Sequence, residues 1–242
     1  TSVSRGLGDV YKRQEYEVSV KSGKFIYENL KDNSDWNVYE VCISNDKNFV
    51  KYNEKVYDLD YESFSFSVNG NVLKPDAVFN IIHGEPGENG DLAEILERNK
   101  IPQTACDVYV SKLTSNKKKY IEFVNSIGIP SSKQVLITSN DINNLSSLLS
   151  SITFPCIVKP NNGGSSIGVS KVYKSNELYE KVQIAFKEDN EVLIESFLDG
   201  QEVSVGVIQN KNDRIILPIT EIISDNEPVS YTHLTLPTTL QV

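Results

Sequence analysis

A lysine followed by a run of small residues is the stretch of this sequence that most clearly implies chemistry. Residues 154–158 read as a short apolar strand, and that strand ends on Lys159. The glycines and serines of residues 161–168 would leave backbone N–H groups free to approach phosphate oxygens. Strand-like alternation resumes at residues 169–173. The sequence therefore predicts a lysine at the root of a flexible loop between two strands, an arrangement that suits an anion.

This loop differs from two common phosphate-binding motifs. The lysine precedes the glycines, which excludes G-x-x-x-x-G-K-[ST], and a strand follows them, which excludes a G-x-G-x-x-G motif that opens a helix. An ordinary Gly/Ser hairpin turn beside a surface lysine is the alternative interpretation of this stretch taken alone.

The resemblance to a known family rests on four motifs. The pattern K-P-x-x-x-G-S-S-x-G, followed further along by V-L-I-E-x-F-x-x-G-x-E-x-S-V, is similar to the central part of the ATP-grasp enzymes. It is most similar to the D-alanine–D-alanine ligase family. Residues 83–90, H-G-E-P-G-E-N-G, resemble that family's H-G-x-x-G-E-D-G, and residues 15–19, E-Y-E-V-S, resemble its E-x-E-V-S. The motifs occur in the expected order between residues 15 and 227.

The resemblance implies an ATP site. Lys117 and Lys159 match the two lysines that contact phosphates, and each would neutralise charge as ATP binds and reacts. Glu195 and the backbone of residues 196–198 would line the adenine pocket, while Glu202 would accept hydrogen bonds from the ribose hydroxyls. The implied ATP-binding residues are Lys117, Lys159, Gly164, Ser165, Ser166, Glu195, Ser196, Phe197, Leu198 and Glu202.

Simpler interpretations of these charged residues stay open. Lys117 could be a surface lysine on a helix, and Asn116 stands before it where the family usually has an aspartate. Glu195 and Glu202 could be ordinary charges at strand ends.

The same resemblance implies the substrate side. Glu15 would pair with the ammonium of the first D-alanine, and His83 and Glu88 would lie near the acceptor amino acid. Ser165 would help to fix the first substrate and a closing loop that excludes water from the reaction. The implied catalytic residues are thus Glu15, Ser165 and His83, although a purely structural role is the alternative for the histidine.

The implied reaction follows from the chemistry of carboxylates. A carboxylate is a poor electrophile, so phosphorylation by ATP with Mg²⁺ or Mn²⁺ would convert the first D-alanine to an acyl phosphate. The amine of the second D-alanine would then displace phosphate, giving a dipeptide for peptidoglycan precursor synthesis. A D-alanine–D-lactate or D-alanine–D-serine ligase, or another ATP-grasp carboxylate–amine ligase, would share the nucleotide half. A nucleotide-binding module without turnover is the alternative from a different class.

The elements that must position these residues read as an α/β protein. We predict helices at residues 19–30, with Ser19 as N-cap, and at 91–99, 116–127, 141–149 and 176–186, and strands at 38–43 and 77–82. The expected organisation is an N-terminal domain with a parallel sheet, residues 15–107, for substrate binding. An incomplete α+β ATP-grasp domain, residues 108–227, would follow it.

Composition limits the partners. The net charge of −9 argues against nucleic acid, and no apolar run is long enough to span a membrane. Cys42, Cys106 and Cys156 lie far apart without a C-x-x-C pair, which is typical of reduced thiols in a cytoplasmic protein. We expect a homodimer at full length.

Both ends of the chain differ in style from the rest. Residues 1–14 lack the apolar strand and glycine-rich turn that the family would need there, and residues 228–242 are threonine-rich and nearly uncharged. We interpret both as foreign tails on a fragment and exclude them from the fold prediction.

We predict that the 242-residue chain by itself ligates nothing. Phosphoryl transfer needs a divalent metal held by carboxylate or amide oxygens. The resembling family supplies these ligands, an arginine and a loop tyrosine from its C-terminal third, and residues 228–242 contain no Asp, Glu, Arg or Asn. The purified chain with ATP, Mg²⁺ and D-alanine should therefore yield no dipeptide by mass spectrometry. Detection of the dipeptide would contradict this assignment of the missing groups.

Overall fold

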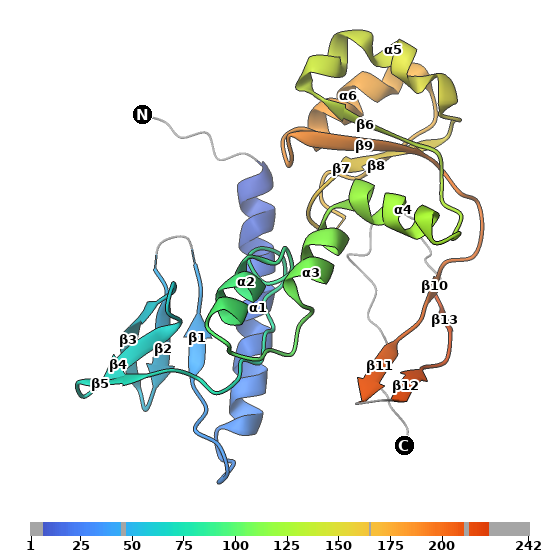
Figure 1. The fold of residues 1–242 in the computed structure, drawn as a ribbon. Helices are drawn as coiled ribbons and strands as arrows, with labels where there is room; N and C mark the ends of the chain where they lie inside the picture. The colour runs from blue at the N-terminus through green and yellow to red at the C-terminus, as the bar shows by residue number, and fades with distance from the viewer. Residues whose placement is uncertain (1–6, 45–46, 165, 211–212, 223–242) are drawn as a thin grey trace, which may run out of the picture. The chain divides into compact units, whose positions relative to one another are not determined.

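The computed structural model describes residues 7–44, 47–164, 166–210 and 213–222, and it divides into two compact units (Figure 1). The first unit comprises Thr1–Ser131 and Asn161–Gly164, and the second comprises Ser132–Pro160 and Ser165–Val242. The predicted domain boundary after residue 107 falls inside the first unit and stays a prediction. Among the described residues, no helix is both long and apolar enough to cross a membrane.

The sheet of the first unit is an antiparallel meander. Its strands pair in the order β1-β2-β3-β4-β5, each with its neighbour in the chain. Their bounds are β1 Glu40–Cys42, β2 Phe49–Tyr52, β3 Lys55–Asp60, β4 Ser65–Val68 and β5 Asn71–Leu73. Asn53-Glu54 and Asn69-Gly70 each have two consecutive positive φ angles, which is the signature of the tight hairpin turn that suits twisted strands.

The mixed α/β class is confirmed, but the sheet of the first unit is not parallel as expected. Residues 77–82 form no strand, and their ladder is reduced to one parallel bridge between Val78 and Gln103. Side-chain oxygens accept hydrogen bonds from the backbone N–H groups that would otherwise pair with a neighbouring strand. The Asn80 N–H donates to Thr104 Oγ1 at 3.1 Å, and the Ile82 N–H donates to Asn80 Oδ1 at 3.1 Å. Competition from one local and one distant side chain therefore overrides the apolar pattern.

Helix α1 runs from Leu7 to Leu30, so the predicted start at Ser19 is wrong. Ser19 lies inside the helix, where its hydroxyl donates to the Glu15 carbonyl at 2.8 Å. This is the back-bonding that serine adopts within a helix, and an N-cap serine would accept a bond from a later N–H instead. The helix also begins within the predicted N-terminal tail.

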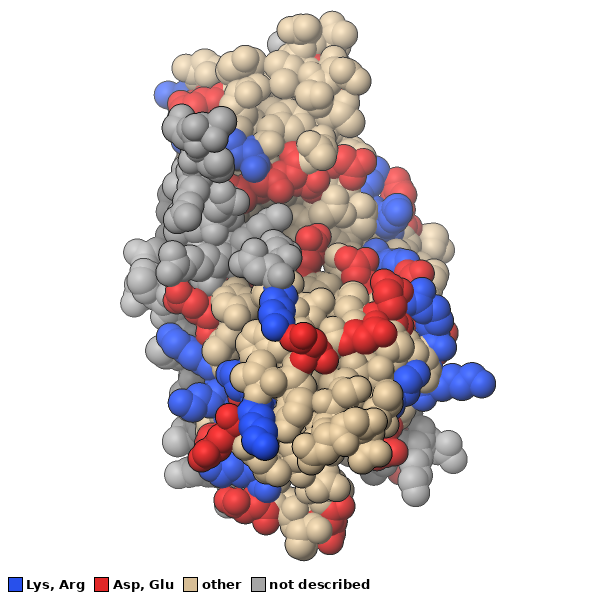
Figure 2. All heavy atoms as spheres, turned by 90° about the vertical axis from the view of Figure 1, so that its left-hand side faces the viewer, with Lys and Arg blue, Asp and Glu red and all other residues tan. Residues whose placement is uncertain are grey.

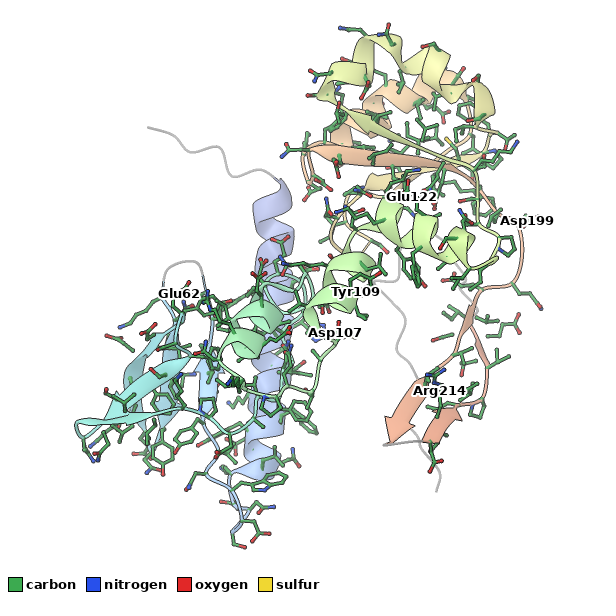
Figure 3. All side chains as sticks on the ribbon, in the orientation of Figure 1. Glu62, Asp107, Tyr109, Glu122, Asp199 and Arg214 are labelled. Atoms are coloured by element: carbon green, nitrogen blue, oxygen red, sulfur yellow. The ribbon has the colours of Figure 1, made fainter. Side chains whose placement is uncertain are left out.

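Three further helices follow the meander, and the two that we predicted here are confirmed. Helix α2, Asp91–Arg98, buries Leu92, Ala93, Ile95 and Leu96, and all of these but Ala93 share a core cluster with Phe64 and Phe66. Helix α3 spans Val108–Ser115 and is capped by the side chain of Asp107, which Figure 3 labels. Helix α4 spans Lys117–Ser126 with Asn116 as N-cap, and none of its residues is buried.

The second unit is built on a four-stranded antiparallel sheet in the order β6-β9-β7-β8. The strands are β6 Gln134–Thr138, β7 Cys156–Pro160, β8 Ser170–Val172 and β9 Glu191–Ser196. Helices α5, Leu145–Leu148, and α6, Leu178–Ala185, contribute to its core with Leu145, Leu178, Val182 and Ala185. The helices predicted at 141–149 and 176–186 are present but start as 3₁₀ turns, at Ser139–Asn144 and Ser175–Glu177.

Two short ribbons extend the second unit. Strands β10, Val203–Ser204, and β13, Thr220–Glu221, pair with each other, as do β11, Val207–Asn210, and β12, Asp213–Ile216. Figure 2 shows acidic and basic side chains interspersed on the face in view, which fits the mixed, net acidic composition.

We predict that Cys156 resists alkylation in the folded chain. Burial raises the pKa of its thiol from 9.0 to about 11, so only about one thiol in a thousand is ionised at pH 8. Cys106 is exposed and provides the internal control. N-ethylmaleimide followed by peptide mass spectrometry should label Cys106 first and Cys156 only after unfolding in urea. Equal labelling rates for the two thiols would show that β7 does not form the centre of a closed core.

Candidate functional site

Lys159 and Glu195 are brought together by the pairing of β7 with β9. Ile157 lies opposite Glu195 and Lys159 lies opposite Leu193, so the two charged residues are diagonal neighbours on one face. Lys159 Nζ donates to Glu195 Oε1 at 2.5 Å. Their side chains are only 19% and 15% exposed, so the pair is partly shielded from water. A fixed ammonium at the end of a strand can bind an anion without reorganisation.

The backbone after β9 offers an open donor at Leu198. The Ser196 N–H donates to the Lys133 carbonyl at 2.9 Å, and the Phe197 N–H donates to the Pro155 carbonyl at 3.0 Å. No described residue accepts a hydrogen bond from the N–H of Leu198, and that residue is 67% exposed. Of the three backbone N–H groups expected to line a base pocket, the third is therefore the one available to a ligand.

Sequence analysis missed one residue beside this segment. Lys171 Nζ lies 3.8 Å from the centroid of the Phe197 ring and 5.3 Å from that of Tyr173. A cation over an aromatic face is attracted by the ring's quadrupole, and this contact fixes the orientation of Phe197. The signal in the sequence was the strand-like alternation of residues 169–173, which places Lys171 and Tyr173 on the same face, opposite to buried Val172.

Three further residues of the implied ATP set belong to the second unit: Glu202, Ser166 and Ser165. Glu202 precedes β10, and its carbonyl accepts a hydrogen bond from the Ile222 N–H at 2.8 Å. Ser166 has a φ of 56°, a left-handed conformation that is uncommon for serine. Ser165, expected to act on the first substrate, lies outside the described residues.

Lys117 contacts the start of the predicted phosphate loop in the first unit. Its ammonium donates to the Gly163 carbonyl at 2.8 Å and to the Asn162 carbonyl at 3.5 Å. Gly164 follows in the same segment and is exposed. The expectation that residue 161 belongs to a freely accessible loop is wrong, because Asn161 is only 1% exposed.

Glu15 and His83 are brought together on the substrate side. The His83 N–H donates to Ser19 Oγ at 2.9 Å, and the same hydroxyl donates to the Glu15 carbonyl. The Glu15 carboxylate packs against Gly84, where an added Cβ would lie 2.4 Å from Oε2 and where φ is 71°. A side chain at residue 84 would therefore collide with the carboxylate and strain the backbone.

Glu88 belongs to the same loop as His83. Its N–H donates to the Gly84 carbonyl at 2.9 Å, and the side chains of both Glu88 and His83 are exposed. The loop ends at Gly90, which has a φ of 95° and is the N-cap residue of helix α2. The three predicted substrate residues thus lie around one tight loop and one helix. Among the described residues, no group of three or more His, Cys, Asp or Glu side chains could hold a metal ion.

Two family models match most of the chain. The model described as D-ala D-ala ligase N-terminus matches residues 12–106, and the model described as D-ala D-ala ligase C-terminus matches residues 123–236. D-alanine–D-alanine ligases from Flavobacterium johnsoniae and Christiangramia forsetii are 42% and 41% identical over 218 residues. Each match covers 90% of this chain and 67% of the relative, so the chain spans about two thirds of their length.

Solved structures share the fold. The VanG D-Ala:D-Ser ligase from Enterococcus faecalis has a TM-score of 0.78 at 25% identity and is matched over 91% of this chain and 69% of its own. D-alanyl-alanine synthetase A from Vibrio cholerae has a TM-score of 0.74 at 24% identity, over 87% of this chain and 64% of its own.

We predict that Ser19→Ala lowers the free energy of unfolding by about 1–3 kcal/mol relative to Ser22→Ala, the cost of two lost hydrogen bonds. Both changes replace a serine of α1 by alanine, so their effects on helix propensity cancel. Among described residues, the Ser22 hydroxyl has no hydrogen-bond partner, whereas Ser19 bonds Glu15 and His83. Urea unfolding of the two variants measures the difference. Equal stabilities would mean that the Ser19 hydroxyl does not join the helix to the loop.

Proposed function

Because the chain belongs to the D-alanine–D-alanine ligase family, a family of ATP-dependent ligases, we propose that the enzyme joins two D-alanine molecules with cleavage of ATP to ADP and phosphate. The ligase class and the peptidoglycan-precursor role expected from sequence agree with this membership. The observation that carries the proposal is the Lys159–Glu195 pair at 2.5 Å, followed by the open N–H of Leu198.

The first step is phosphoryl transfer. A carboxylate oxygen of the first D-alanine attacks the γ-phosphorus of ATP, the bond to the bridging oxygen breaks, and ADP leaves. Lys159 contacts a phosphate, because Glu195 holds its ammonium in place and two of its three donors remain for phosphate oxygens. Lys117 takes the equivalent role through an ammonium that the loop carbonyls hold. Each charge offsets negative charge that develops as the phosphoryl group moves.

The nucleoside is recognised by the segment after β9. The Leu198 N–H donates to the adenine ring, since the two N–H groups before it are engaged by Lys133 and Pro155. Glu202 accepts hydrogen bonds from the ribose hydroxyls. Glu195, the Phe197 ring, Ser196, Gly164 and Ser166 complete the proposed ATP set.

The second step forms the amide. The amine of the second D-alanine attacks the acyl phosphate carbon, and phosphate leaves from the tetrahedral intermediate after the nitrogen loses a proton. Glu15 pairs with the ammonium of the first D-alanine. The Ser19 hydroxyl joins the Glu15 carbonyl to the His83 N–H, and the Glu15 carboxylate packs against Gly84 of the same loop. His83 and Glu88 orient the acceptor, and Ser165 fixes the first substrate.

The partners and setting follow from this chemistry. Mg²⁺ or Mn²⁺ accompanies ATP and neutralises phosphate charge, but we assign it no ligand among the described residues. We place the enzyme in the cytoplasm, where ATP is supplied, and propose a homodimer for the full-length protein. D-Serine is the alternative acceptor with specific support, because the D-Ala:D-Ser ligase of Enterococcus faecalis shares the fold.

The proposal is tested in a chimera, in which residues 15–222 of this chain replace the matching part of the Flavobacterium johnsoniae ligase. We predict that phosphate release depends on D-alanine and that Lys159→Ala lowers kcat about 10²- to 10³-fold, as loss of a fixed transition-state contact does. The control is Lys187→Ala, an exposed lysine of the same unit.

Three results would contradict the assignment. Wild-type kcat in the Lys159→Ala chimera would remove the phosphate role. Faster turnover with D-serine or D-lactate as acceptor would change the substrate. Nucleotide binding without amino-acid-stimulated hydrolysis would favour a binding module.

A further inference from the structure

The N-terminus of helix α4 is closed by one buried asparagine. The Lys117 N–H donates to the Asn161 carbonyl at 2.9 Å, and the Lys118 N–H donates to Asn161 Oδ1, also at 2.9 Å. The first N–H groups of a helix have no partner within the helix and usually bond a capping side chain, water or a ligand. Here a single residue, distant in sequence, satisfies two of them.

The N-cap residue closes the same end from the other side. Asn116 Oδ1 accepts from the Lys119 N–H at 3.0 Å, and Asn116 Nδ2 donates to Asn162 Oδ1 at 3.0 Å. Residues 116 and 162 also form an antiparallel bridge. An aspartate at residue 116 would cap the helix equally well but has no N–H with which to make the second bond. The amide of Asn116 therefore joins the start of α4 to Asn162, which an aspartate could not do.

Burial makes the position of Asn161 well defined. Its side chain is 1% exposed, and a buried amide is costly unless it is hydrogen-bonded. The arrangement also opposes a local repulsion, since Lys117, Lys118 and Lys119 place three positive charges at the positive end of the helix dipole. Along the helix, Lys118 Nζ lies 3.3 Å from Oε1 of Glu122, which Figure 3 labels.

We propose that Asn161 is a positioning residue for Lys117. Its side-chain bond to the Lys118 N–H fixes the first turn of α4, and the fixed turn holds the Lys117 ammonium on the carbonyls of Gly163 and Asn162. This inference rests on the proposed function in so far as Lys117 contacts ATP. An ammonium has three donors, so it can keep a loop carbonyl and still bind a phosphate oxygen.

The test compares the reactivity of neighbouring lysines in the full 242-residue chain. Acetic anhydride at low dose, followed by peptide mass spectrometry, gives the acetylation rate of Lys117 relative to exposed Lys119 in the same helical turn. In the wild type we expect Lys117 to react more slowly than Lys119. In Asn161→Ala the relative rate of Lys117 should rise about two- to tenfold, the factor that corresponds to one lost hydrogen bond.

Two matched variants separate this role from a general loss of stability. Asn161→Asp keeps an acceptor of the same shape and should leave Lys117 as slow as in the wild type. Asn125→Ala removes an exposed amide from the other end of α4 and should change neither lysine. Hydrogen exchange of the Lys118 amide should accelerate in Asn161→Ala and stay slow in the two other variants.

An unchanged relative rate of Lys117 in Asn161→Ala would overturn the proposal. If that variant does not fold, Asn161→Asp decides the question. Equal acetylation rates of Lys117 and Lys119 in Asn161→Asp would also overturn the proposal. A separate arm adds ATP and Mg²⁺ to the wild type. Failure of ATP to protect Lys117 would contradict the phosphate role of Lys117 in the proposed function, and the comparison of variants without nucleotide would still decide the role of Asn161.

Discussion

The pairing of β7 with β9 is the constraint on which the second unit of this protein depends. Cys156, Val158 and Pro160 alternate into the core, so the residues between them must face the other way. A shift of one residue in the register would turn Lys159 into the core and expose Val158. The hydrophobic core therefore fixes the place of the ammonium, and the ion pair with Glu195 refines it.

In the first unit, the corresponding constraint is the close approach of helix α1 to the loop at residues 81–84. Helix α1 reaches the loop at residues 81–84 through small residues, and an added Cβ on Gly23 would lie 3.8 Å from Ile81. This contact allows one serine hydroxyl to bond both the helix and the loop. A ligase needs its substrates fixed before the acyl phosphate forms, because reacting groups that are already oriented lower the barrier. Small residues thus allow the helix and the loop to approach closely enough for this bond.

Much of the fold was predictable because its signals are local. The helices α2 and α4, the apolar strand β7 and the order of residues within each of the four motifs all depend on residues near one another in the chain. The same holds for the candidate site, where Lys159 and Glu195 each stand at a recognisable strand end. The start of α1 and the strand at 77–82 were wrong, since Ser19 and Asn80 could bond either local or distant groups.

The sequence by itself determined the family, the class of chemistry and the residue types that carry charge, because these depend on composition and order along the chain. Only the tertiary structure decided which polar groups meet. It placed Asn161 at the start of α4, joined His83 to Ser19, and engaged the N–H groups of Ser196 and Phe197. The physical reason is that a hydrogen-bond donor can bond any suitable acceptor. The packing of apolar residues selects which acceptor lies within reach.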